Sequence, residues 1–170
     1  MILGMSIETF TLVHTAISLI GIVSGLVVVY GMLGGKRLDG WTALFLTTTV
    51  LTSVTGYLFP FEHLLPSHIV GGISLVVLAV ALLARYSFHL AGGWRRTYVL
   101  TAVMALYLNV FVLVVQSFLK VPALHALAPA GKEPPFAVAQ LIVLAIFIWL
   151  AIAAVKRFRQ DNTQAWGQAA

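Results

Sequence analysis

The stretch that decides the fold covers residues 10–34 and reads FTLVHTAISLIGIVSGLVVVYGMLG. It contains no Asp, Glu, Lys or Arg. At 1.5 Å per residue, a helix of this length crosses the ~30 Å hydrocarbon core of a bilayer. One face of that helix would carry a histidine, a serine and two glycines, namely His14, Ser18, Gly21 and Gly25. The stretch therefore predicts a membrane-spanning helix with one polar, small-residue face.

The rest of the chain has the same character. Of its 170 residues, 61% are hydrophobic and 9% are charged, whereas soluble domains have about 25% charged residues. The charges cluster and leave five long uncharged stretches, which lie between Glu8 and Lys36, Asp39 and Glu62, Glu62 and Arg85, Arg96 and Lys120, and Glu133 and Lys156. Each stretch is long enough to span a bilayer as a helix, and too long for a barrel strand. We therefore expect an all-α membrane protein with five transmembrane helices in a single bundle.

The predicted helices cover residues 8–34, 41–59, 67–90, 97–120 and 136–156, within one transmembrane domain of residues 1–158. Residues 159–170 are polar, and we expect a disordered cytoplasmic tail. The chain has no cysteine, which excludes disulfides, thiolate zinc sites and iron–sulfur clusters built from its own residues.

The basic residues are distributed unevenly between the two sides of such a bundle. If five helices alternate, one side carries Lys36, Arg37, Arg85, Arg95, Arg96, Lys156, Arg157 and Arg159, and the other carries Lys120 and Lys132. By the positive-inside rule, this bias places the amino terminus outside and the carboxyl terminus in the cytoplasm. Positions beside lipid headgroups explain these charges, so we expect the bilayer, and not nucleic acid, as their partner.

Four of the five histidines fall on the outer side in this arrangement: His14, His63, His68 and His125. Imidazole is a common ligand of haem iron, copper and zinc. The most specific hypothesis is a redox-linked b-type haem held near the outer face by His14 and His68, whose helices run in the same direction. Four glycines would give clearance for the ring: Gly21, Gly25, Gly71 and Gly72. Gly21 and Gly25 also form a GxxxG motif, which is typical of close helix packing.

Three other interpretations remain open. An outer-face copper or zinc site would use His63, His68 and His125 with Glu62. A small transporter or proton path would use His14 with polar residues of the second and fourth helices, namely Thr48, Thr52, Asn109 and Gln116, which otherwise serve helix packing. The chain would alternatively be a non-catalytic accessory or assembly subunit, in contact with another membrane protein or a second copy through its small-residue faces. No hydrolase motif or P-loop is present, so electron transfer is the most that we expect as catalysis.

The segment KVPALHALAP at residues 120–129, followed by EPPF at 133–136, resembles a stretch of small proteobacterial inner-membrane proteins that carry no assigned activity. The resemblance would cover most of the chain. It implies a multi-pass protein of the bacterial inner membrane and says nothing about mechanism.

Overall fold

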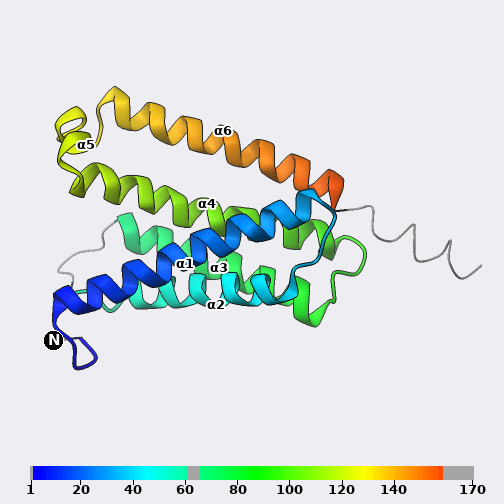
Figure 1. Ribbon diagram of the computed structural model, residues 1–170. Coiled ribbons are helices and arrows are strands. Elements are labelled where there is room, and N and C mark those ends of the chain that lie inside the picture. The colour runs from blue at the N-terminus through cyan, green and yellow to red at the C-terminus, as the bar shows by residue number, and fades with distance from the viewer. Residues whose placement is uncertain (1, 61–65, 159–170) are drawn as a thin grey trace, which may run out of the picture.

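The structure is a computed structural model that describes residues 2–60 and 66–158, and all of its regular elements there are helices (Figure 1). They are α1 (Ile7–Leu33), α2 (Asp39–Gly56), α3 (Pro66–Leu82), a π-helical turn η1 (Leu83–Ser87), α4 (Trp94–Lys120), α5 (Pro122–Leu127) and α6 (Pro134–Arg157). The expected all-α class is confirmed for this part of the chain.

Four helices are long and apolar enough to cross a membrane: Ile7–Leu33, His68–Ser87, Trp94–Lys120 and Pro134–Arg157. A multi-pass membrane protein is therefore supported. The helix α2 is not among the four. Its 18 residues include Asp39, Ser53 and a series of threonines, which lower its mean hydropathy.

Two predicted segments differ in detail from the observed elements. The helix expected over residues 67–90 is α-helical only to Leu82 and continues as the π-helical turn η1. The segment after Lys120, where no helix was predicted, contains the short helix α5, which has Pro122 in its first turn. Proline suits that position because the first helical N–H groups have no intrahelical acceptor.

The long helices run approximately antiparallel and form a bundle with two distinct ends (Figure 1). The start of α1, the end of α2 and the end of α4 lie at one end, which we name the histidine end because His14 and His68 lie toward it. The α1–α2 connection, η1 and the carboxyl end of α6 lie at the other, which we name the arginine end. These two ends define the depth of each residue along the bundle axis.

Close packing of α1, α2 and α4 forms the centre of the bundle. Gly25 faces Phe45 and Leu106, which are 1% and 0% exposed. By contrast, α6 packs mainly against α4, and only Phe147 and Ala154 are buried in it. A helix that is apolar all round suits contact with lipid on its remaining faces.

Candidate functional site

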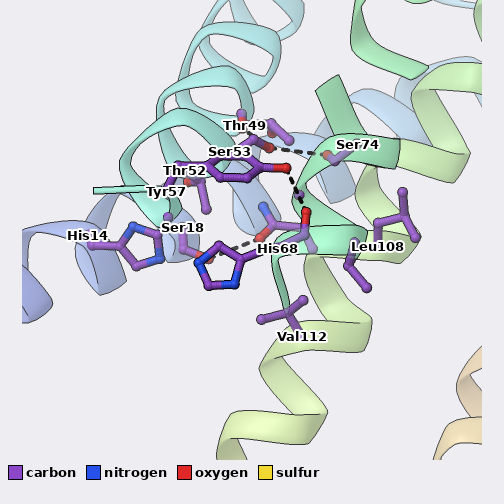
Figure 2. A pocket seen from close by; sticks show the side chains of 14 residues that line it. His14, Ser18, Thr49, Thr52, Ser53, Tyr57, His68, Ser74, Leu108 and Val112 are labelled. Carbon is purple, nitrogen blue, oxygen red and sulfur yellow. Dashed lines mark hydrogen bonds between the residues drawn. The ribbon is translucent and has the colours of Figure 1, made fainter. Parts of the chain in front are cut away.

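A polar cavity of about 100 Å³ lies toward the histidine end, between α1, α2, α3 and α4 (Figure 2). Its polar lining consists of His14, Ser18, Thr49, Thr52, Ser53, Tyr57, His68, Ser74 and Asn109. We name it the histidine cavity. No Asp, Glu, Lys or Arg is among the described residues that line it.

A second cavity of about 510 Å³ adjoins the histidine cavity and extends toward the histidine end. The two cavities share five lining residues: His14, Ser18, Gly56, His68 and Val112. The larger one continues along α4 past Gln116 to Lys120, the last residue of that helix. We name it the vestibule, because it connects the histidine cavity with the end of the bundle.

His14 forms a hydrogen bond with Thr55. Its Nδ1 lies 2.8 Å from Thr55 Oγ1. The Thr55 hydroxyl also lies 2.7 Å from the carbonyl oxygen of Leu51, and a hydroxyl that donates to this carbonyl accepts from His14 Nδ1. A neutral ring with its proton on Nδ1 leaves the Nε2 lone pair available as an acceptor or a metal ligand.

Asn109 contributes a buried amide from α4. It is 7% exposed, and its Oδ1 accepts a hydrogen bond of 3.0 Å from the hydroxyl of Ser18. Its Nδ2 has no hydrogen-bond partner among the described residues. A buried amide N–H that lacks a partner costs roughly 1–3 kcal/mol, and this nitrogen is enclosed beside Gly21.

The hydroxyls of α2 present acceptors to the histidine cavity. Thr52 donates to the carbonyl oxygen of Thr48 at 2.9 Å, and Thr49 donates to that of Phe45 at 2.7 Å. Ser53 lies 3.2 Å from the hydroxyl of Ser74 on α3. Because the α2 threonine protons are used within their own helix, the threonine oxygens face the cavity with free lone pairs.

His68 enters the cavity from the first turn of α3 and is 6% exposed. Tyr57, which follows α2, donates its hydroxyl to the carbonyl oxygen of His68 at 2.6 Å. Its ring also contacts the imidazole, with centroids 5.6 Å apart. The structure thus brings His14 and His68 to one cavity, as Figure 2 shows.

Side chains lie close to all four predicted clearance glycines, of which Gly71 also lines the histidine cavity. A Cβ on Gly21 would lie 3.2 Å from the hydroxyls of Thr48 and Thr49, and a Cβ on Gly25 would lie 2.7 Å from Leu106. Gly71 and Gly72 both face the ring of Tyr57. These glycines allow close helix and side-chain packing, which is the simpler meaning of the GxxxG motif.

Two of the predicted copper or zinc ligands, His68 and His125, lie within the described structure, and they do not line the same cavity. Glu62 and His63 lie outside the described residues. His125 is in α5 and does not line either cavity. Across residues 2–60 and 66–158, no group of three or more His, Cys, Asp or Glu side chains is placed to hold a metal ion.

Of the predicted polar-path residues, Thr52 and Asn109 line the histidine cavity, Gln116 lines the vestibule, and Thr48 packs against Gly21. Tyr57 and Ser74 also line the histidine cavity and were not predicted as site residues. Helical spacing could have identified Ser74, because it lies three residues after Gly71 and six after His68. All three residues therefore lie on one face of α3.

Comparison with protein-family models, with curated proteins and with solved structures returns no match for this chain. Its function is therefore argued from the geometry of the histidine cavity alone.

Proposed function

We propose that this chain is a five-span protein of the bacterial inner membrane, with its amino terminus outside, and that it is a carrier for small uncharged solutes. The membrane placement is supported by four apolar helices and by the gathering of Lys and Arg at one end of the bundle. The observation that carries the carrier function is the histidine cavity, an uncharged polar site buried in an otherwise apolar bundle.

The chemistry of the cavity selects the class of solute. The Asn109 amide offers a donor, whereas His14 Nε2 and the threonine oxygens offer acceptors. A molecule that both donates and accepts hydrogen bonds satisfies all of these groups. In a cavity of this kind ~10–15 Å³ is enough to hold one water, so about 100 Å³ has room for several waters or for one small solute. Small amides and polyols, such as urea and glycerol, have this size and chemistry.

Among the described residues, the route is open toward one end of the bundle only. The vestibule leads from the histidine cavity to Lys120. In the other direction, the buried side chains of Phe45 and Leu106 close the space between α1, α2 and α4. A carrier that moves solute must therefore also populate a second arrangement of these helices, in which the arginine end opens.

Permeation into proteoliposomes tests the carrier function. We expect the wild-type protein to increase the uptake of urea or glycerol, followed by stopped-flow light scattering, above that of protein-free liposomes. The variant Asn109→Leu should slow this uptake about fivefold, because it removes one hydrogen bond worth ~1 kcal/mol. Gln140→Leu is the matched control, because Gln140 is an amide of α6 that lines neither cavity. Uptake no faster than that of protein-free liposomes would disprove the carrier function.

The second candidate is the redox-linked b-type haem. The observation that favours it is that His14 and His68 both line the vestibule, and that Thr55 leaves His14 Nε2 free as a ligand. An absorption spectrum of the detergent-purified protein from haem-replete cells, before and after reduction with dithionite, tests it. A Soret band that is lost in both His14→Ala and His68→Ala would establish ligation by both. If the spectrum shows no haem bands and the proteoliposomes take up no solute, the chain would be interpreted as a non-catalytic accessory subunit.

A further inference from the structure

A third cavity of about 360 Å³ lies at the arginine end, away from the histidine cavity. Its lining includes Arg37 from the α1–α2 connection, His89 and Gly92 from the turn before α4, Arg95 from the first turn of α4, and Phe158 after α6. We name it the arginine cavity. Two guanidinium groups and one imidazole face it, and no carboxylate is among its described lining residues.

The arginines of this cavity have no anionic partner in the described part of the chain. The carboxylate of Asp39 is paired with Arg85, and no ion pair or hydrogen bond of Arg37 or Arg95 side chains is present among residues 2–60 and 66–158. Positive charge gathered without compensation repels itself, so an anion bound between Arg37 and Arg95 would stabilise this end.

The start of α4 also favours an anion, because it places the positive charge of Arg95 at a helix amino terminus. Arg95 lies in the first turn of α4, which contains no acidic residue, and Gly93 offers no side chain to cap the helix. A helix amino terminus carries partial positive charge and free N–H groups, so cations there are disfavoured and anions are favoured. The same groups that disfavour Arg95 would bind a phosphate well.

The backbone of the preceding turn also has an unusual conformation. His89 and Leu90 have φ of 48° and 59°, and Gly92 has φ of 52°. Non-glycine residues rarely adopt this left-handed conformation. This turn places His89 at the cavity in an unfavourable backbone conformation. Residues in such conformations are concentrated at functional sites.

The aromatic residues around the arginine cavity are of the kind found at the headgroup region of a bilayer. Exposed aromatic side chains lie around this end of the bundle, namely Tyr30, Trp41, Tyr86 and Phe88. Trp94 stacks on Phe88 with ring centroids 4.0 Å apart. Tyr and Trp concentrate at the membrane–water interface, where phospholipid phosphates also lie.

We propose that the arginine cavity binds the phosphate of an anionic phospholipid. Arg37 and Arg95 would each present a planar fork of N–H donors to the phosphate oxygens, and His89 would donate a further hydrogen bond. A soluble phosphate compound has the same binding chemistry, and the experiment below separates the two sources. This site is independent of the solute carrier function, because it shares no lining residue with the histidine cavity or the vestibule.

Native mass spectrometry of the detergent-purified full chain tests the proposal. The probes are phosphatidylglycerol and phosphatidylcholine with identical acyl chains, with inorganic phosphate as competitor. We expect the wild-type protein to retain phosphatidylglycerol in preference to phosphatidylcholine. Arg37→Gln and Arg95→Gln should each reduce the retained phosphatidylglycerol about five- to tenfold, because each removes one cationic contact.

Arg96→Gln is the matched control, because it removes the same charge from the neighbouring residue, which is exposed and does not line the cavity. Retention equal to wild type in Arg96→Gln supports the site. Equal losses in Arg95→Gln and Arg96→Gln, or equal retention of the two lipids, would overturn it. Displacement of phosphatidylglycerol by inorganic phosphate at similar concentration would assign the site to a soluble phosphate compound. If Arg95→Gln does not fold, Arg95→Lys keeps the charge, loses the fork and should still weaken retention.

Discussion

At the residue scale, Gly25 allows three helices to pack at the centre of the bundle. A Cβ built on it would lie 2.7 Å from Leu106 Cδ1 and 2.8 Å from the ring of Phe45. Real Cβ atoms do not come so close to carbon, and both neighbours are buried. Gly25 therefore determines how closely α1 approaches α2 and α4.

We expect Gly25→Ala to lower the free energy of unfolding by about 1–3 kcal/mol, because the added methyl group overpacks a filled site. Thermal unfolding in detergent, followed by circular dichroism, measures the change. Gly40→Ala in α2 is the matched control, because nothing lies within 4 Å of a Cβ there, and it should not lower the stability. A Gly25→Ala protein as stable as wild type would show that α1 can move away without cost.

Glu133 organises the connection before α6. Its carboxylate accepts hydrogen bonds from the backbone N–H groups of Ala130 and Lys132, both at 2.9 Å. These two hydrogen bonds lower the pKa of Glu133 below the ordinary glutamate value, and the bond from Ala130 has the largest effect. Because the pKa is lowered on folding, the contribution to stability is present above the unfolded pKa and is lost as the pH falls through the lowered one.

Accordingly, Glu133→Ala should increase amide hydrogen exchange at Ala130 and Lys132 at neutral pH relative to wild type. The difference between the two proteins should disappear at a pH below the lowered pKa of Glu133, where the wild-type carboxyl is also neutral. Hydrogen-exchange mass spectrometry of the peptide that covers residues 128–135 measures both. Unchanged exchange at neutral pH would contradict the role of these hydrogen bonds.

At the scale of elements, Arg85 connects the π-helical turn η1 with the start of α2. Its side chain is 5% exposed and forms an ion pair with Asp39, whose side chain is 73% exposed. The guanidinium also lies 5.3 Å from the ring centroid of Tyr98 and 5.7 Å from that of Tyr86. The extra residue in a π turn reorients the side chains that follow it, and such turns are frequent at functional sites.

Asp39→Asn should destabilise the protein by about 1–3 kcal/mol, because it leaves the buried Arg85 charge without its carboxylate. The double variant Asp39→Asn with Arg85→Met should recover part of this loss, since it contains no uncompensated buried charge. Thermal unfolding of the wild type and the variants measures both effects. A double variant less stable than Asp39→Asn would contradict this explanation and indicate that the contacts of Arg85 with Tyr86 and Tyr98 dominate.

At the scale of the whole molecule, the distribution of charge makes a prediction about topology. Lys36 lies in the α1–α2 connection at the arginine end, and Lys132 precedes α6 at the histidine end. Both are exposed, and the chain contains no cysteine. Single cysteines at these positions therefore report the side of the membrane without a background signal.

In intact cells, Lys132→Cys should react with a membrane-impermeant maleimide, and Lys36→Cys should react only after the membrane is opened. A cysteine at the exposed Leu58, which follows α2, should behave like Lys132→Cys if α2 also spans the membrane. The reverse pattern for Lys36 and Lys132 would overturn the proposed orientation. Protection of Leu58→Cys in intact cells would remove α2 from the spans.

Much of the fold was predictable because its determinants are local. A run of apolar residues such as 10–34 must form a helix in lipid, where its own backbone supplies the only hydrogen-bond partners. The face shared by His14 and Ser18 followed from helical periodicity alone. The π-helical end of α3 and the helix α5 were not predicted, because short elements depend on their neighbours more than on periodicity.

By itself, the sequence determined the all-α membrane class and the positions of the long apolar helices. Only the tertiary structure placed His14, His68 and Asn109 around one cavity and filled the space beside Gly25. Helices that are apolar on every side carry no local signal of which helix they contact. That choice depends on packing between residues far apart in the chain, such as the hydrogen bond of Ser18 to Asn109.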